Sequence, residues 1–174
     1  TEFTIAPTVF PEFTPALATA MVDEVKAFLN AQLAKAAPSL KDVTQSTQSF
    51  VSDALASIYG VAKTGSTTLT PLDPKQRLGI FTLPGVITSH SGPDTTRLVK
   101  RGVFFTRKVM CMPLGQPPAG VNTAIPADAT GTERQRVETA TQSGACPACH
   151  QVINPFGFMQ QNFDPLGRWR TLDN

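Results

Sequence analysis

Residues 146–150 read Cys-Pro-Ala-Cys-His, in a chain of 174 residues that holds three Cys and two His. This C-x-x-C-H pattern is the attachment sequence of a c-type haem. Two thiols separated by two residues can each add to one haem vinyl group, and the next residue, His150, supplies an axial imidazole nitrogen to the iron. The sequence therefore predicts one covalent haem c, bound through Cys146 and Cys149, and a fold built around it.

Two other interpretations of the cysteine pair agree less well with the rest of the chain. A structural zinc site needs four ligands, usually from two such pairs, and the remaining candidates, Cys111 and His90, match no standard zinc spacing. A redox-active dithiol follows a strand in an α/β pattern, whereas residues 141–145 are polar and small. Because haem attachment consumes the other two cysteines, we expect Cys111 to be a buried, reduced thiol.

Composition limits the possible partners. Apolar residues make up 41% of the chain, and the formal net charge of +2 is too small to indicate nucleic-acid or membrane-surface binding. No run of about 18 apolar residues occurs, so no transmembrane segment is expected. The chain opens without an initiator Met, so we expect a processed product or part of a longer protein. Covalent haem attachment takes place outside the cytoplasm, which predicts a periplasmic or extracellular location.

Apolar residues recur at helical spacing in several segments, and no pair of alternating segments indicates a sheet. The predicted fold class is mainly α: a small helical domain with long Pro/Gly-rich loops packed around one covalently bound haem c. The expected helical segments are residues 14–37, 47–59, 78–88 (one or two short turns), 96–112 and 132–142.

The helix ends carry recognisable signals. Thr14 is expected to cap the first helix, with Pro15 at its first position. Gly60 is expected to end the second helix, and Thr132 with Gln135 resembles a capping box.

The helix over residues 96–112 is expected to bury one face and expose another. A loop rich in Pro, Ala and Gly follows at residues 114–130, and its length predicts that it lies over the surface or over the haem. The residues expected to be buried are Val99, Val103, Phe104 and Val109. Those expected to form a solvated basic face are Lys100, Arg101, Arg107 and Lys108.

Residues 146–170 read CPACHQVINPFGFMQQNFDPLGRWR. They resemble the end of a planctomycete-type cytochrome domain, where C-x-x-C-H is followed by D-P-x-G-F and by E-N-F-D-x-x-G-R-W/Y-R. These domains are catalogued as domains of unknown function 1588 and 1592, and they occur in large multidomain secreted proteins. Upstream, residues 50–60 resemble the end of the 1592 domain, and residues 79–90 and 99–102 resemble the opening of the 1588 domain.

The resemblance implies two parts: an N-terminal arm and helical subdomain over residues 1–75, related to 1592, and a haem c domain over residues 76–174, related to 1588. It implies a haem domain and no named reaction. The sequence departs from the family pattern at Asn154, where the family has Asp, at Gln161, where it has Glu, and at residues 95–98. These departures remove partners of local salt bridges and leave the attachment residues intact.

The second axial position of the iron has several candidates. Met159 follows His150 by only nine residues, so the chain would have to pass around the haem edge at once. Met110 and Met112 stand near the loop that follows their helix, and an open position is a further alternative. His90 is the only other imidazole, and the family match places it near the opening of the haem domain. We therefore predict bis-histidine ligation by His90 and His150.

The expected function is electron transfer through the haem, with a redox partner protein or a larger multihaem complex. Arg168 or Arg170 is expected to pair with a haem propionate. Two alternatives stay open: a peroxidase- or oxygenase-like haem enzyme with an open sixth position, and an accessory structural subunit of a multihaem complex. No catalytic pattern occurs outside the haem residues. The aromatic residues expected to surround the haem are Phe156, Phe158, Phe163 and Trp169.

Overall fold

The computed structural model describes residues 3–117, 119 and 130–172, so most of the predicted loop at 114–130 lies outside the described residues. The chain divides into two compact units. Unit 1 consists of Thr1–Thr95 with Phe163–Trp169, and unit 2 consists of Thr96–Asn162 with Arg170–Asn174. The predicted boundary between residues 75 and 76 separates two sequence domains. The compact units are defined by contacts instead, so they do not test this boundary, and it stays a prediction.

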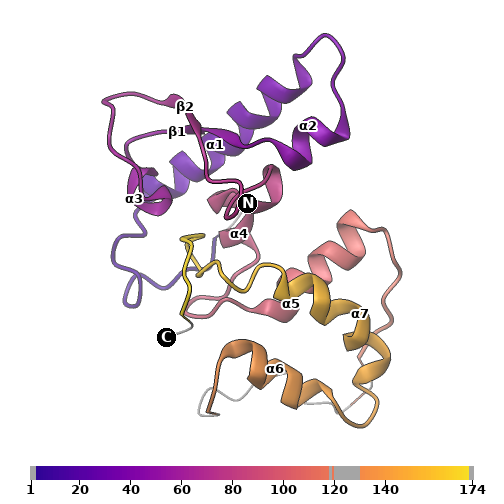
Figure 1. Ribbon diagram of the computed structural model, residues 1–174. Helices are drawn as coiled ribbons and strands as arrows, with labels where there is room; N and C mark the ends of the chain where they lie inside the picture. The colour runs from indigo at the N-terminus through magenta and orange to yellow at the C-terminus, as the bar shows by residue number, and fades with distance from the viewer. Residues whose placement is uncertain (1–2, 118, 120–129, 173–174) are drawn as a thin grey trace. The chain divides into compact units, whose positions relative to one another are not determined.

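The fold is mainly α, as the sequence predicts (Figure 1). Among the described residues, unit 1 holds four α-helices, one 3-10 helix and a two-stranded sheet, and unit 2 holds three α-helices and one π-helix. In unit 1 the elements are α1 Pro15–Leu33, α2 Leu40–Gln45, β1 Gln48–Val51, α3 Ala56–Tyr59, β2 Thr68–Pro71, η1 Ile80–Thr82 and α4 Pro84–Ser89. In unit 2 they are α5 Leu98–Phe104, η2 Phe105–Val109, α6 Glu133–Thr141 and α7 Pro147–Phe158.

Helix α1 begins as predicted. The Thr14 hydroxyl accepts a hydrogen bond from the Leu17 backbone N–H at 3.2 Å, and Pro15, at the first position, has no N–H to leave unpaired. The helix ends at Leu33, four residues before the predicted end. Its buried stripe packs into a cluster that includes the N-terminal arm and the returning C-terminal segment. The members of this cluster are Ile5, Leu17, Met21, Val51, Leu55, Ile58 and Leu166.

The predicted helix over residues 47–59 is wrong in its first half. Residues 48–51 form β1, which pairs antiparallel with β2 in the register Gln48↔Pro71 to Val51↔Thr68. Ser49 and Val51 alternate inward along the strand. The second half is helical as α3, and Gly60 ends it in the left-handed region at φ 68°, as predicted. Pairing with a segment about 20 residues away outweighs the local helical pattern.

In unit 2, helices α5 and α7 approach closely because each presents a glycine to the other. A Cβ on Gly102 would overlap the backbone oxygen of Ile153, and a Cβ on Gly157 would overlap that of Leu98. Helix α6 begins with the predicted capping box of Thr132 and Gln135.

Two expectations about the segment 96–112 need correction. Arg101 was predicted to be solvated, but its side chain is fully buried, and Nη1 donates a hydrogen bond of 2.9 Å to the backbone oxygen of Gln160. The four apolar side chains expected to be buried are half-buried, whereas the buried ones are Leu98 and Phe105. The burial stripe is therefore rotated from the predicted one, because α7 packs against the face that carries Gly102.

No helix in the described ranges is both long enough and apolar enough to cross a lipid bilayer.

Candidate functional site

The C-x-x-C-H residues form the first turn of α7. Pro147 occupies the first helical position, and the backbone N–H groups of Cys149 and His150 donate to the Cys146 carbonyl oxygen at 3.2 and 3.0 Å. Cys146 and Cys149 thus stand three residues apart on one helical turn, with His150 next in the chain. All three side chains are half-buried.

This turn meets the chemical requirements of haem attachment. Both thiols are free rather than joined in a disulfide. The imidazole of His150 has one ring nitrogen, Nδ1, in a hydrogen bond of 2.9 Å with Asn154 Oδ1. A ligating histidine almost always donates its other ring N–H to an acceptor in this way. The residues present therefore fit a covalent haem with His150 as an axial ligand.

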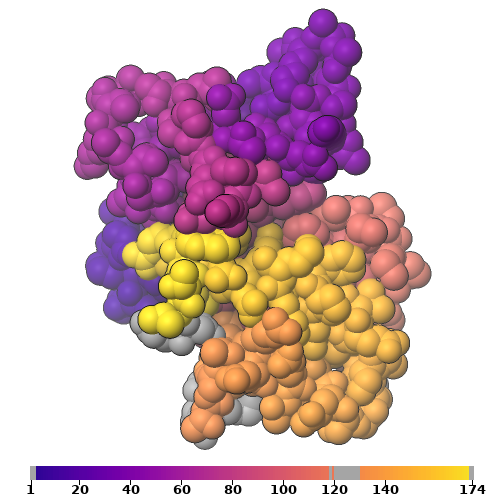
Figure 2. Space-filling view, in the orientation of Figure 1, coloured from indigo at the N-terminus to yellow at the C-terminus, as the bar shows by residue number. Residues whose placement is uncertain are grey.

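An open groove of about 740 Å³ lies beside His150 in unit 2. Its volume falls within the roughly 300–1,000 Å³ of cofactor and ligand pockets. Helices α6 and α7, which supply its walls, both reach the surface in Figure 2. The two cysteines are not among the lining residues. Those residues are Arg134, Glu138, Thr141, Gln142, Pro147, His150, Gln151, Asn154, Pro155, Phe158 and Met159.

A hydrogen-bonded chain connects His150 to helix α6. Asn154 Nδ2 donates to Thr141 Oγ1 at 2.9 Å, and the Thr141 hydroxyl donates to the Val137 carbonyl oxygen at 2.7 Å. Thr141 is buried, at 7% exposure. The imidazole is therefore oriented by two side chains, one from each of the two helices.

The described residues contain no group of three or more His, Cys, Asp and Glu arranged to hold a metal ion.

His90 lies in unit 1, where it forms the C-terminal cap of α4. Its Nδ1 is 2.9 Å from the Val86 carbonyl oxygen and 2.9 Å from the Ser89 hydroxyl. These two contacts hold the imidazole against the end of α4. His150 belongs to unit 2, so ligation of one iron by both histidines stays a prediction.

The three methionine candidates all belong to unit 2 and are exposed: Met110 by 51%, Met112 by 39% and Met159 by 60%. Of these, Met159 lines the same groove as His150.

The predicted burial of Cys111 is wrong. Cys111 is exposed, and its backbone lies in the left-handed region at φ 54°. This residue directly follows the π-helix η2 and its cap Met110, so it lies beyond the end of the helix.

The four aromatic residues predicted around the haem fall into two pairs. Phe156 stacks on Phe105 of η2, with ring centroids 6.3 Å apart, and Phe158 lies under the Arg134 guanidinium at 4.8 Å, both in unit 2. In unit 1, Phe163 and Trp169 meet edge to face at 5.2 Å and form an isolated β-bridge. Only the first pair shares a unit with His150.

Two family models match this chain. Residues 77–173 match the family described as "Protein of unknown function (DUF1588)", named PSCyt3, and residues 1–61 match the one described as "Protein of unknown function (DUF1592)", named PSD4. The chain belongs to the DUF1588 family. The match covers more than half of the chain and includes the whole C-x-x-C-H turn. No curated protein and no solved structure matches this chain.

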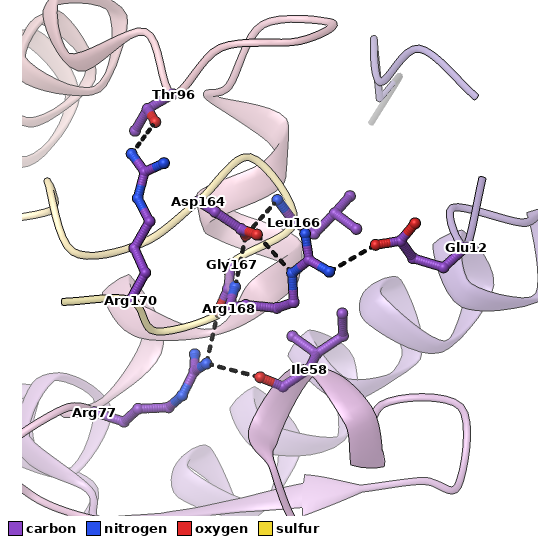
Figure 3. Close-up of polar contacts among 9 residues, drawn as sticks. All are labelled: Glu12, Ile58, Arg77, Thr96, Asp164, Leu166, Gly167, Arg168 and Arg170. Carbon is purple, nitrogen blue, oxygen red and sulfur yellow. Dashed lines mark hydrogen bonds and ion pairs between the residues drawn. The ribbon is translucent and has the colours of Figure 1, made fainter. Parts of the chain in front are cut away.

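The end of the DUF1588 match forms a tight bend. Gly167 has a φ of 78°, and its N–H donates a hydrogen bond of 3.0 Å to the Asp164 carbonyl oxygen, which closes the turn. Arg168 does not extend into open solvent. Its Nε lies 2.5 Å from Asp164 Oδ2, and its Nη1 lies 2.6 Å from Glu12 Oε1 (Figure 3).

The other arginines of this region also have protein partners. Arg77 Nη2 donates to the Gly167 carbonyl oxygen at 2.6 Å, and Arg170 Nη2 donates to Thr96 Oγ1 at 2.8 Å (Figure 3). Pairing of Arg168 or Arg170 with a haem propionate stays a prediction.

One polar cluster was missed by the sequence reasoning. Glu24, 2% exposed, accepts hydrogen bonds from the hydroxyls of Ser49, at 2.6 Å, and Tyr59, and Arg77 lies over the Tyr59 ring at 4.4 Å. Burial raises the pKa of Glu24 to about 7, against the smaller lowering effects of these hydroxyls and of Arg77. The signal was present in the sequence, since Glu24 continues the helical spacing of Leu17, Met21 and Phe28.

Proposed function

We propose that this chain is a c-type cytochrome domain that carries one covalent haem and transfers electrons outside the cytoplasm. The observation that carries the proposal is the C-x-x-C-H turn, with two free thiols and an imidazole held at Nδ1 by Asn154. The name PSCyt3 of the matching family hints at a cytochrome-like domain. When bound, the haem would supply the redox chemistry, and the chain would hold and orient it.

The packing of unit 2 supports a cofactor in this part of the chain. Among the described residues, its buried apolar side chains are few: Leu98, Phe105, Val137 and Ile153. Around them lie half-buried or exposed large apolar groups. These are Phe104, Phe156, Phe158, Met110, Met112 and Met159. When a large apolar cofactor covers surface of this kind, each Å² of apolar area removed from water stabilises the complex by about 25 cal/mol.

Intact mass and the pyridine haemochrome spectrum test haem attachment. The full chain, exported by a host that matures c-type cytochromes, is expected to gain the mass of one haem and to show a c-type band. Cys146→Ala and Cys149→Ala should each remove one thioether and shift the band. Cys111→Ala, the matched control outside the motif, should leave the spectrum unchanged. An exported chain without added mass would exclude the proposal.

A six-coordinate haem has no open position for substrate chemistry, which favours electron transfer, and we propose His90 as the second ligand. Nδ1 of His90 lies 2.9 Å from the Val86 carbonyl oxygen, a contact in which a ligating histidine would donate its Nδ1–H and bind iron through Nε2. His90→Ala should convert a low-spin ferric spectrum to high-spin and create affinity for small ligands. An unchanged low-spin spectrum would point to Met110, Met112 or Met159 instead. A high-spin spectrum in the unmutated protein would favour the haem enzyme with an open position.

A further inference from the structure

We propose that Asn154 and Thr141 fix the tautomer of the neutral His150 imidazole, with the proton on Nδ1 and the lone pair on Nε2. The tautomer follows from the hydrogen bonds of the chain alone. Its consequence for the haem rests on the proposed function.

The donor and acceptor in each hydrogen bond of this chain can be assigned in turn, starting from the Val137 carbonyl oxygen. The Val137 carbonyl oxygen can only accept, so the hydroxyl proton of Thr141 points toward it at 2.7 Å. With its single proton used, Thr141 Oγ1 can only accept from Asn154 at 2.9 Å. The Asn154 amide nitrogen therefore faces Thr141, although the two ends of an amide are otherwise hard to distinguish.

The amide orientation then determines the imidazole. With Nδ2 directed at Thr141, Oδ1 faces His150 Nδ1 at 2.9 Å. A carbonyl oxygen cannot donate, so Nδ1 must carry the proton, and Nε2 is left with the lone pair. The protonation site of an α7 side chain is thus set by a backbone carbonyl of α6, through two side chains.

The chemical nature of the acceptor adds a second consequence. Asn154 offers a neutral amide oxygen, whereas Asp at this position would offer a carboxylate. A carboxylate acceptor makes a ligating imidazole a stronger electron donor than an amide does. Stronger donation stabilises ferric iron more than ferrous iron. This chain should therefore have a higher reduction potential than the same chain with Asp at position 154.

The tautomer is tested first on the haem-free full chain, so that this test does not depend on haem attachment. Nitrogen-15 NMR at about pH 8.5, where a free imidazole is neutral, distinguishes protonated from unprotonated ring nitrogens. His90→Gln leaves a single imidazole and assigns the signals. We expect His150 to show a protonated Nδ1 and a bare Nε2. A protonated Nε2 would overturn the proposal.

Two variants of Thr141 separate tautomer control from folding. Thr141→Val removes the acceptor for the Asn154 amide, so the two tautomers should become mixed. Thr141→Ser keeps the hydroxyl and should keep the unmutated pattern. If Thr141→Val unfolds the chain, Asn154→Leu provides the same test by removing the acceptor of Nδ1. A folded variant of either kind with an unchanged tautomer would overturn the proposal.

The haem-loaded protein tests the second consequence. Asn154→Asp should lower the midpoint potential and shift the hyperfine-shifted NMR signals of the His150 ring. Gln151→Glu adds the same charge to the same helix and the same groove, but Gln151 is exposed and makes no hydrogen bond with His150 in the described chain. It should change the potential less and leave the His150 signals in place. Equal effects of the two variants would show a general charge effect and overturn the second consequence. Failure of the haem to attach would instead exclude the proposed function.

Discussion

The two units of this chain are built by different means. Unit 1 closes around α1 with a continuous apolar cluster that includes Met21, Leu55 and Leu166, each of them fully buried. Unit 2 has a sparse apolar interior, and its helices α5 and α7 instead meet through Gly102 and Gly157. The candidate haem residues stand in the second unit. The difference indicates that unit 1 is stabilised by its own core, whereas unit 2 depends on close helix contact and, under the proposed function, on a cofactor.

Buried polar groups follow the same division. In unit 1, Glu24 accepts hydrogen bonds from two hydroxyls, and burial raises the pKa of its carboxyl to about 7. In unit 2, the network of buried Thr141 and half-buried Asn154 ends on His150, a side chain that lines the surface groove. The Glu24 network lies among core residues, and the Thr141–Asn154 network orients the imidazole of His150, a potential metal ligand. Changes in the first should affect folding, and changes in the second should affect the orientation of His150 and, under the proposed function, the haem.

The largest effect is expected from the glycine contacts of unit 2. Gly102→Ala places a methyl group against the Ile153 backbone, which cannot move without displacing α7. Overpacking of this kind costs about 3 kcal/mol or more when backbone is involved. Urea unfolding should show a destabilised unit 2, with poorer haem incorporation. Gly115→Ala, where an added Cβ meets nothing within 4 Å, is the matched control. Equal stability of the two variants would contradict the close contact of α5 and α7.

The next largest effect is a pH dependence in unit 1. Because burial raises the pKa of Glu24 from 4.5 to about 7, the folded state binds a proton more tightly than the unfolded state. The contribution of Glu24 to stability is therefore present below about pH 4.5 and is lost as the pH rises toward 7. A shift of this size corresponds to about 3 kcal/mol.

Glu24→Gln should remove this part of the pH dependence. Unfolding free energies measured between pH 5 and 8 should fall less steeply with pH in Glu24→Gln than in the unmutated protein. Asp23→Asn, which neutralises the exposed neighbouring carboxylate, should leave the slope intact. Equal slopes for the unmutated protein and Glu24→Gln would show that Glu24 is ionised in the folded state.

A smaller effect is expected at the C-terminal bend of unit 1. Arg168→Ala breaks the ion pairs with Asp164 and Glu12. Because the arginine side chain is 39% exposed, solvent screens these pairs, and the loss should be about 1 kcal/mol. Thermal unfolding followed by the fluorescence of the single tryptophan, Trp169, reports on this unit. Arg168→Lys should recover part of the loss.

An unchanged haem potential in Arg168→Ala would exclude a propionate role for this residue.

The smallest effect is expected at Cys111. Since this thiol is exposed, Cys111→Ala should change the unfolding free energy by less than about 0.5 kcal/mol. A bulky maleimide should label it rapidly in the folded protein, whereas Cys111→Ala should show no rapid phase. Slow labelling that appears only on unfolding would restore the burial expected from the sequence.

Several features of the fold could be predicted from local sequence. The caps at Thr14 and Thr132 and the stop at Gly60 depend on residues within one turn, and all three are confirmed. The C-x-x-C-H turn is equally local, and its backbone hydrogen bonds span only four residues. The pairing of Asn154 with His150 follows from their i, i+4 spacing on α7 and could have been predicted.

Other features were decided by contacts between segments that lie far apart in the sequence. Residues 48–51 form a strand because their backbone pairs with residues 68–71, although the local pattern favoured a helix. Arg101 is buried and Cys111 exposed because of where α7 packs and where η2 ends. The orientation of the Asn154 amide required Thr141, which belongs to another helix. The sequence by itself determined the helix caps at Thr14 and Thr132, the stop at Gly60 and the C-x-x-C-H turn, since those depend on neighbours along the chain. The tertiary structure alone decided burial, strand pairing and proton position, because each depends on groups brought together only by folding.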